Sequence, residues 1–471
     1  MTFNSLQYAA FLPLVLILYW LLPRRPQNLL LLVASYIFYG AFDWRFLALL
    51  WISTLTDYTV GRLLERTDAP RLRKRIFAVS LCVNLGILGF FKYFDFFTSD
   101  GTRFLAHLGI HLAPPVLKIL LPVGISFYTF HGMSYTFDVY RRDIEPTHSL
   151  LNFAVFVAFF PQLVAGPIGR AQLQLPQFER DRIPPDWAEV RRALFLILLG
   201  LFKKIAIADM LAPYVNSAFG SPSKTSFVGL LVGVWAFAFQ IYGDFSGYSD
   251  IARGSAFLLG IELPENFNQP YFSRSVTEFW RRWHISLSNW LRDYLYIPLG
   301  GNRGTEGQTY RNLMLTMLIG GLWHGAATTF VIWGGLHGLF LVAERRFTDI
   351  PLEDWRRPWS LRRDLLRTVI TFQLVCVAWV FFRAPSTNGA LHYLSDIAHL
   401  QHGTTDHNAV AMLALAAAAM VFVDYVQLRA RDHAAFVDWN PLVRGFMYGC
   451  LIVPIVIFSG GTPVPFIYFR F

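Results

Sequence analysis

Residues 278–303 of the 471-residue chain read EFWRRWHISLSNWLRDYLYIPLGGNR, and residues 312–326 read NLMLTMLIGGLWHGA. The first block is aromatic and basic, while the second opens an apolar segment with one imidazole, that of His324, near its centre. An ionisable side chain is costly in membrane-embedded sequence, so its presence there is a functional-site hypothesis by default. These two blocks, which carry His284 and His324, therefore predict the site around which the rest of the chain is arranged.

The composition predicts a polytopic membrane protein. Hydrophobic residues make up 54% of the chain and charged residues only 15%, with a mean hydropathy of +0.40, whereas soluble domains carry about 25% charged residues. The net charge of +10 comes from loops between apolar runs, as positive-inside topology requires, so it does not indicate nucleic-acid binding. Cys82, Cys376 and Cys450 stand alone in apolar sequence and are expected to be packing residues.

Apolar runs recur along the chain and predict an all-α fold with about eleven transmembrane helices, good to two either way. Several runs are shorter than the roughly 20 residues that a span needs, so re-entrant and interfacial helices are expected around a central tunnel. The Gly166-Pro167 pair excludes one straight helix over residues 159–170. We find no internal repeat or second soluble domain, and therefore expect one integral membrane domain over residues 1–471, with its catalytic core at about 115–345.

Basic clusters indicate the orientation of the first spans. Arginines and one lysine gather at residues 24–25 and 62–75, and both clusters are expected on the cytoplasmic side. The segment between them must then cross twice and turn near Asp43-Trp44-Arg45, which places the N-terminus outside the cytoplasm. Residues 1–6 lack the basic region of a cleavable signal, so the apolar run over 8–22 is expected to be the first retained span.

The aromatic block has the spacing of an amphipathic interfacial helix. Its apolar side chains recur every three to four residues, at Trp280, Trp283, Leu287, Trp290 or Leu291, and Tyr294. Two interpretations of this helix stay open. In the first, it only anchors the protein at the membrane surface, and His284 is an incidental interfacial residue. In the second, it forms one wall of a cytoplasmic entrance for an anionic, nucleotide-bearing donor. In that case, Gly300-Gly301-Asn302-Arg303 forms a flexible basic lip. The candidate donor-binding and tunnel-lining residues are Trp283, Asn289, Arg281, Arg282, Asp293, Asn302 and Trp323.

His324 is the sharper catalytic candidate. Small residues flank it in Gly320-Gly321-Leu-Trp-His-Gly-Ala-Ala327, so a ligand or another backbone can approach closely, with Trp323 as a rigid wall. A buried neutral imidazole is a suitable general base. A structural, hydrogen-bonded histidine is the alternative, and a metal ligand is disfavoured because no second ligand stands at the required spacing. His337 is not expected to pair with His324, and His131 is expected to be a packing or hydrogen-bonding residue.

The chemistry that fits these residues is direct transfer between two substrates. The sequence holds neither a Gly-Xaa-Ser-Xaa-Gly elbow nor a phosphate-binding Gly-Lys-Ser/Thr loop. His324 would take the proton of an acceptor hydroxyl that attacks a thioester, while His284 or Asn289 orients the donor or stabilises the oxyanion. A transporter with His324 along its path is a rival of another class, disfavoured because no internal symmetry is evident.

The same blocks resemble the membrane-bound O-acyltransferase (MBOAT) family, in particular its bacterial alginate O-acetylation branch. The resemblance extends to five further stretches and reaches about Ala384. They are Leu29-Leu-Leu-Leu-Val-Ala-Ser-Tyr, Leu121-Pro-Val-Gly-Ile-Ser-Phe-Tyr, Phe160-Pro-Gln-Leu-Val-Ala-Gly-Pro, Asp244-Phe-Ser-Gly-Tyr-Ser-Asp and Trp379-Val-Phe-Phe-Arg-Ala. The resemblance implies an MBOAT fold with a tunnel through the membrane, and it places the family's active-site histidine at His324 and its second motif histidine at His284.

The resemblance further implies an acetyltransferase of the bacterial inner membrane that binds no cofactor or metal and uses acetyl-CoA as its donor substrate. Acetyl would pass to a periplasmic partner of the SGNH-hydrolase-like type and from there to a polysaccharide, alginate first. The ending Pro465-Phe-Ile-Tyr-Phe-Arg-Phe471 also resembles relatives that act on cellulose or peptidoglycan. Acylation of a lipid or a protein is a rival within the enzymes.

Overall fold

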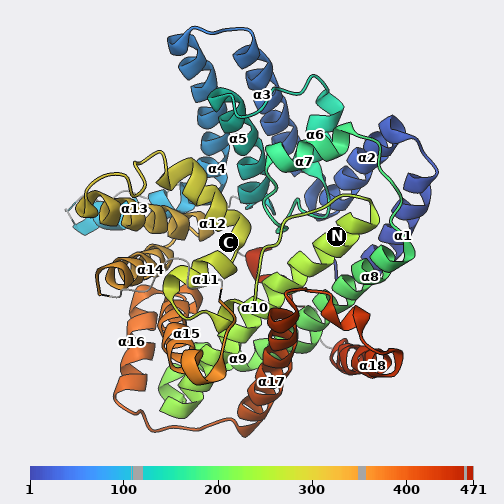
Figure 1. Cartoon of the computed structure of the whole chain (residues 1–471). Helices are drawn as coiled ribbons and strands as arrows, with labels where there is room; N and C mark the ends of the chain where they lie inside the picture. Colours follow the sequence, from blue (N-terminus) through green and yellow to red (C-terminus); the bar gives the residue numbers. More distant parts are fainter. Residues whose placement is uncertain (108, 110–119, 348–356, 461–463, 470–471) are drawn as a thin grey trace. The chain divides into compact units, whose positions relative to one another are not determined.

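The computed structural model describes residues 1–107, 109, 120–347, 357–460 and 464–469, and its regular structure over these ranges is helical (Figure 1). The chain forms two compact units. Unit 1 comprises Met1–Val190 with Ser255–Pro264, and unit 2 comprises Arg191–Gly254 with Glu265–Phe471. The all-α prediction is confirmed, while the prediction of a single domain over 1–471 stays a prediction.

Unit 1 is a set of helices joined by short connections. They are α1 (Leu6–Trp20), α2 (Arg24–Asp43), the 3-10 turn η1 (Trp44–Phe46), α3 (Leu47–Glu65), α4 (Pro70–His107), α5 (Ile125–Arg141), α6 (Leu150–Ala158) and α7 (Ala171–Glu179). A buried carboxylate, Asp57 of α3, accepts hydrogen bonds from Ser80 and Asn84 of α4, at 2.5 and 2.8 Å. These bonds satisfy the polar groups that α3 and α4 bury against each other.

The predicted turn near residue 44 is present. The Asp43 side chain accepts from the backbone N–H of Arg45 and so caps η1, where the chain changes direction. The rings of Tyr36 and Trp51 lie 5.7 Å apart as a result, whereas a straight helix would separate residues 15 positions apart by about 22 Å. The change of direction is therefore confirmed, and which side of the membrane it faces stays a prediction.

The break at Gly166-Pro167 is also confirmed. Helix α6 ends at Ala158, and residues 159–170 run as turns and irregular backbone up to α7. This segment is buried, and the Gln162 side chain donates to the Phe156 carbonyl and accepts from Gln174, at 2.8 and 2.6 Å. Irregular backbone inside a membrane protein needs such internal partners.

Unit 2 contains both sequence blocks and the remaining helices, except for residues 187–190 of α8 and 255–258 of α10, which belong to unit 1. Its helices are α8 (Trp187–Leu201), the π-helix η2 (Phe202–Asp209), α9 (Met210–Gly220), η3 (Pro222–Lys224), α10 (Phe227–Leu258), η4 (Pro270–Phe272), α11 (Val276–Arg282), α12 (Ile285–Leu291), η5 (Arg292–Tyr296), α13 (Glu306–His324), α14 (Thr328–Phe347), α15 (Leu361–Arg383), α16 (Thr387–Ala398), α17 (His407–Ala430), η7 (Ala435–Asp438), α18 (Pro441–Phe458) and η8 (Ile467–Phe469). The apolar window of α10 is 78% buried, the highest value among the candidate membrane spans in the described residues.

Helices α13 and α14 form a close pair, side by side in Figure 1. A Cβ atom on Gly334 would lie 2.3 Å from the Met317 carbonyl oxygen and 3.2 Å from the Cα of Gly321. Likewise, a Cβ on Gly321 would lie 2.3 Å from the Phe330 carbonyl oxygen. The two glycines therefore let the backbones meet, as small residues do between membrane helices. The expected close approach at Gly320-Gly321 is confirmed, and another backbone makes it.

Six candidate spans in the described residues are long and apolar enough to cross a membrane. They are Arg24–Glu65, Pro70–Phe94, Phe227–Leu258, Leu361–Arg383, His407–Ala430 and Pro441–Phe458. The first of them includes the turn at η1, and Leu6–Trp20 is a shorter apolar helix. The chain thus has the helices of a membrane protein, and the number of about eleven crossings stays a prediction.

Candidate active site

The structure brings the two histidines of the sequence blocks together within unit 2. His284 lies between α11 and α12, and His324 is the last residue of α13. Their ring centroids are 6.4 Å apart, and both side chains are buried. Because they come from separate helices, this proximity is a product of the tertiary fold.

The prediction of one continuous amphipathic helix over Trp280–Tyr294 is wrong. Helix α11 ends at Arg282, Trp283 is extended, and His284 has a left-handed backbone with φ +43° before α12 begins. The break is held by a connector outside the stretch. The N–H of Asn268 donates to the Arg282 carbonyl and the N–H of Ile285 donates to the Asn266 carbonyl, both at 2.9 Å. His284 is fully buried, which excludes the interpretation that it is an incidental interfacial residue.

Asn266 sets the hydrogen-bonding state of His284. The amide oxygen of Asn266 accepts from Ser286 Oγ at 2.8 Å and lies 3.1 Å from His284 Nδ1. Its amide nitrogen donates to Ser249 Oγ at 3.3 Å, which agrees with this orientation of the amide. An amide oxygen can only accept, so Nδ1 carries the proton and Nε2 carries the lone pair. Burial lowers the pKa of His284 to about 3, so the imidazole is neutral at physiological pH.

His324 occupies an aromatic enclosure at the end of α13. Its ring lies 4.9 Å from Trp333 of α14, 5.0 Å from Trp323 and 5.4 Å from Phe382 of α15, measured between centroids. Gly325 is required directly after it, because a Cβ there would lie 2.2 Å from the Phe330 ring. The last turn of a helix favours positive charge through its carbonyl dipoles. His324 is therefore placed to accept a proton in a low-dielectric setting.

Trp283 and Trp323 belong to the same cluster. The Trp283 ring stacks on Phe279 at 5.5 Å and contacts Trp379 at 5.2 Å. Trp323 lies 5.9 Å from His284 and thus stands beside both imidazoles. These two predicted wall residues are buried with the histidines, so the enclosure excludes water and strengthens electrostatic interactions inside it.

The other predicted lining residues lie in different places. Arg281 and Asn289 line a cavity of about 610 Å³ beside α11, α12, α13 and α14, whereas Arg282 lines a second cavity. Asp293 pairs with Arg292 at 2.7 Å, and Asn302 is exposed in the loop before α13. Neighbouring arginines of one short helix therefore face two cavities, and the predicted single basic entrance is divided.

His337 of α14 is a packing residue of the same cluster. The Trp280 indole N–H donates to His337 Nδ1 at 3.3 Å, and Trp333 lies 4.9 Å from both the His324 and the His337 rings. His131, in α5 of unit 1, is buried and packs on Phe156 at 6.0 Å. Within the described ranges, no group of three or more His, Cys, Asp or Glu side chains is arranged to hold a metal ion.

Sequence reasoning missed the role of Asn266. It stands in the irregular connector Pro264-Glu-Asn-Phe-Asn-Gln-Pro270, whose lack of periodicity was the only available signal. The stretch Asp244–Asp250, one of those that carry the family resemblance, has a carboxylate at each end, and the sequence does not indicate their buried partners. Lys204 pairs with Asp244 and Lys203 pairs with Asp250, each at 2.7 Å. These ion pairs join η2 to α10 and account for the motif structurally.

Comparison with known proteins gives one consistent picture. The family model "MBOAT, membrane-bound O-acyltransferase family" matches residues 37–384, a range that includes Asn266, His284 and His324. A "Probable alginate O-acetylase AlgI" of Azotobacter vinelandii is 47% identical over 81% of this chain and 74% of that protein. One of Pseudomonas putida is 40% identical over 98% of both chains. A "Peptidoglycan O-acetyltransferase" of Helicobacter pylori is 37% identical over 88% of this chain and 82% of that protein.

Proposed function

The chain belongs to the membrane-bound O-acyltransferase family, and on that premise we propose that it moves acetyl groups from cytoplasmic acetyl-CoA across the bacterial inner membrane for O-acetylation of a polysaccharide. The observation that carries this proposal is the buried pair of imidazoles, His284 and His324, 6.4 Å apart in an aromatic enclosure. Acyl transfer between a thioester and a hydroxyl needs a base and excluded water, and this enclosure supplies both.

In the proposed reaction, His324 takes the proton of the acceptor hydroxyl as its oxygen attacks the thioester carbonyl carbon. The tetrahedral intermediate then expels the thiolate, the carbon–sulfur bond breaks, and the proton passes from His324 to the leaving sulfur. The products are an acetyl ester and a free thiol, so atoms and charge balance. His284 has its lone pair on Nε2, so it accepts a hydrogen bond that orients a substrate N–H or O–H. The Nε2 atom of this tautomer cannot donate to an oxyanion, which supports orientation of the donor as the role of His284 in this proposal.

Alginate is the first candidate for the polymer. Relatives named as probable alginate O-acetylases cover most of this chain at 40–47% identity. Peptidoglycan is the second candidate, because the Helicobacter pylori peptidoglycan O-acetyltransferase is 37% identical. Acetylation assays of the two polymers in a deletion strain complemented with this chain distinguish them.

We further propose that a periplasmic SGNH-hydrolase-like protein receives the acetyl group and esterifies the polymer. The support is the family resemblance together with the six candidate membrane spans found in the described residues, which suit a protein that carries acetyl from one side to the other. Co-purification of such a partner with the tagged chain, followed by release of acetyl to added polymer, tests this step.

The deciding experiment uses radiolabelled acetyl-CoA with the purified protein and an extract that contains the partner and polymer. Wild type is compared with His324→Ala and with His392→Ala, a matched control at an exposed position of α16. We expect loss of transfer by about two orders of magnitude or more in His324→Ala only, with equal thermal melts. Wild-type activity in a folded His324→Ala variant would assign His324 a structural role and move the site elsewhere.

A further inference from the structure

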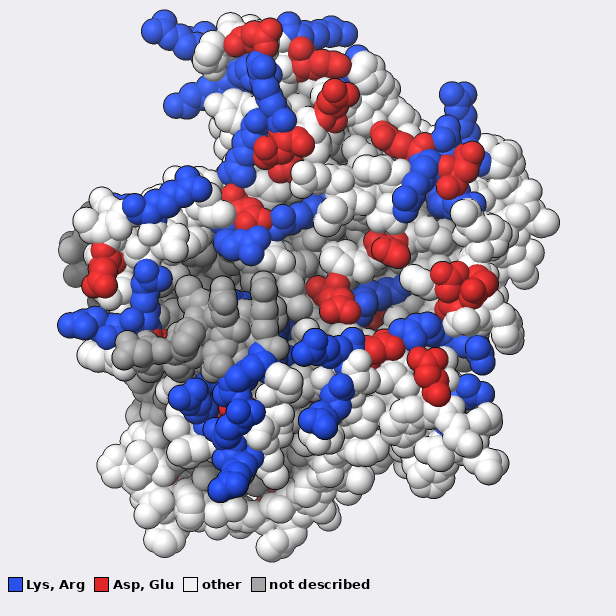
Figure 2. All heavy atoms as spheres, viewed as in Figure 1, with Lys and Arg blue, Asp and Glu red and all other residues white. Residues whose placement is uncertain are grey.

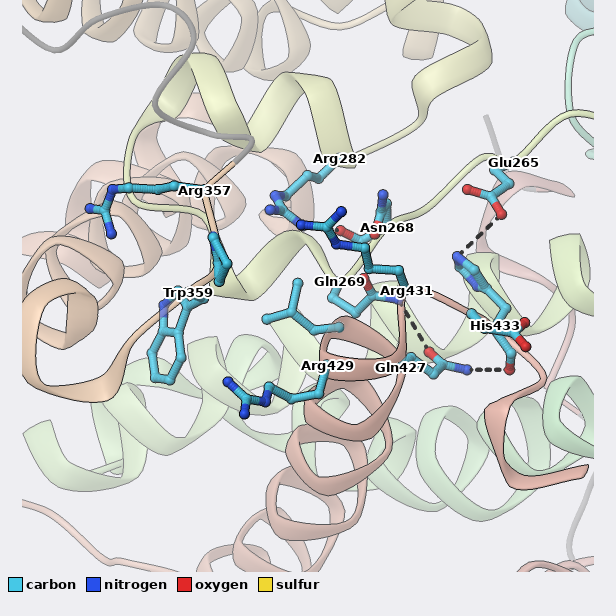
Figure 3. Close-up of a pocket in the computed structure, with 13 residues that line it drawn as sticks. Glu265, Asn268, Gln269, Arg282, Arg357, Trp359, Gln427, Arg429, Arg431 and His433 are labelled. Atoms are coloured by element: carbon cyan, nitrogen blue, oxygen red, sulfur yellow. Dashed lines mark hydrogen bonds and ion pairs between the residues drawn. The ribbon is translucent and has the colours of Figure 1, made fainter. Parts of the chain in front are cut away.

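The cavity that Arg282 lines is strongly basic. It measures about 540 Å³, and four arginines, Arg282, Arg357, Arg429 and Arg431, surround it, against two carboxylates, Glu265 and Asp432 (Figure 3). Its volume lies in the range of small-molecule sites. The lining comes wholly from unit 2. In Figure 2, Lys and Arg side chains gather over the part of this face where α11 and the C-terminal end of α17 lie in Figure 1.

Each carboxylate of the cavity has an arginine partner outside the lining, and Glu265 also lies 3.5 Å from His433 Nε2. Asp432 pairs with Arg192 at 2.7 Å, and Glu265 pairs with Arg253 at 3.2 Å. The net positive charge of the cavity therefore comes from those of its arginines that have no carboxylate partner. Burial holds the pKa of the lining histidine, His433, well below its ordinary value, so it adds no positive charge near neutral pH.

Two of the arginines are held in place and two are available to a ligand. Arg282 pairs with Glu278 at 2.8 Å, and Arg357 pairs with Asp364 at 2.5 Å. Arg429 and Arg431, at the C-terminal end of α17, are exposed and make no ion pair within the described part of the chain. Fixed and flexible guanidinium groups around one cavity form a receptor for a ligand with several phosphate oxygens.

An aromatic wall and a hydrogen-bonded frame complete the cavity. The Trp359 indole N–H donates to Thr368 Oγ1 at 3.1 Å, and its ring packs edge-on against Phe272 at 5.1 Å. Gln427 joins two walls, because it donates to the His433 carbonyl at 2.8 Å and accepts from Gln269 at 3.3 Å (Figure 3). A fixed indole beside arginines offers a flat ring on which a nucleobase stacks.

Two residues that line the cavity are close in sequence to residues of the candidate active site. Arg282 and Asn268 line it, and each stands two residues from a member of the active site, His284 and Asn266. The Asn268 N–H donates a 2.9 Å hydrogen bond to the Arg282 carbonyl and so holds these two segments of the chain side by side. Two residues extend over at most about 7 Å, so the segments that carry these lining residues also carry Asn266 and His284 within that distance along the backbone.

We propose that this cavity binds the phosphate-bearing, nucleotide end of the acyl donor, while the donor's flexible arm carries the thioester toward His324. The identity of the donor rests on the proposed function. The chemistry recognised is a diphosphate next to an aromatic base. An anionic lipid headgroup presents the same phosphate oxygens without the base, and the test separates the two sources.

The test compares Arg429→Gln/Arg431→Gln with Arg66→Gln/Arg71→Gln, a control pair that removes the same charge at exposed positions of unit 1. Binding of radiolabelled coenzyme A is measured by equilibrium dialysis on protein in nanodiscs of zwitterionic lipid. We expect about tenfold weaker binding or more in the first variant only. Inorganic diphosphate should compete with coenzyme A, whereas pantetheine, which lacks the phosphates, should not distinguish the variants.

Transfer kinetics and lipid retention separate the remaining outcomes. In the cavity variant, the KM for acetyl-CoA should rise about tenfold while kcat stays within about twofold, because the reacting groups are untouched. Unchanged coenzyme A affinity with normal transfer overturns the proposal and leaves the acetyltransferase function standing. Loss of co-purifying phosphatidylglycerol with unchanged coenzyme A binding assigns the cavity to lipid and also overturns it. Weakened coenzyme A binding in a chain that transfers no acetyl supports the cavity and refutes the proposed function.

Discussion

The amide oxygen of Asn266 and the Nδ1 atom of His284 lie 3.1 Å apart, although 18 residues separate them in the chain. This bond fixes both the tautomer and the ring orientation of an imidazole that also occupies a left-handed backbone position. Asn266 is thus a positioning residue for His284, and its contribution to the reaction can be measured separately from that of the imidazole.

Replacing Asn266 by alanine should lower kcat by about one to two orders of magnitude, because the His284 ring loses its orienting acceptor. Asn266→Asp keeps the acceptor and adds a charge that favours the imidazolium. Its activity should therefore fall at a higher pH than that of wild type as the solution is acidified. The pH–rate profile checks this, and an unchanged acid limb in an active Asn266→Asp variant would contradict the positioning role.

The crossing of α13 and α14 should tolerate no side chain at Gly334. In Gly334→Leu the new Cβ would meet the Met317 carbonyl, so the helices must separate, and Trp333 moves away from His324. We expect a melting temperature lower by several degrees together with loss of transfer. Gly86→Ala in α4, where a Cβ meets nothing within 4 Å, is the control and should melt at or slightly above the wild-type temperature.

Replacing one partner of the Lys203–Asp250 pair should destabilise the protein strongly, whereas replacing both partners with apolar residues should destabilise it little. Lys203→Met leaves a buried carboxylate without its partner and should destabilise the protein by about 3–5 kcal/mol. Lys203→Met/Asp250→Leu should recover most of that loss, since neither charge of this pair remains buried without its partner. Denaturation of both variants in detergent measures the difference. Arg142→Gln, which breaks an exposed pair with Asp68, should cost no more than about 1 kcal/mol. Equal losses in the single and double variants would argue against the ion-pair account.

Stability should fall as the pH drops below about 6.5, in part through His433. Burial keeps the pKa of its imidazole well below the ordinary value in the folded protein, whereas the unfolded chain titrates near 6.5. The unfolded state therefore binds more protons in acid, and the free energy of unfolding decreases as pH falls. His433→Gln should flatten this dependence between about pH 7 and 5, as measured by thermal melts. An unaltered slope would assign the effect to other groups.

Local sequence pattern predicted much of the architecture. The apolar runs, the turn at Asp43 and the break at Gly166-Pro167 depend on nearby residues, and all three are present in the structure. The break at Trp283-His284 could not be predicted in this way. The spacing of its apolar residues favours a continuous helix, and the hydrogen bonds that interrupt it come from residues 266–268.

The candidate site shows the same division. His284, His324, Trp283 and Trp323 could be selected as unusual residues in apolar or aromatic sequence. Their proximity depends on the α13–α14 crossing and on Asn266, neither of which leaves a periodic signal. The basic cavity could not be predicted from the sequence for a similar reason, because its arginines come from separate segments of the chain.

The left-handed backbone of His284 has a consequence for how this protein can be engineered. A non-glycine residue in that conformation is strained by about 1–2 kcal/mol, and interactions in the surrounding fold must offset this cost. Glycine at this position would relieve the strain while removing the imidazole, so selection for thermal resistance alone would favour an inert enzyme. At position 284, selection for thermal stability and selection for catalytic activity therefore favour different residues.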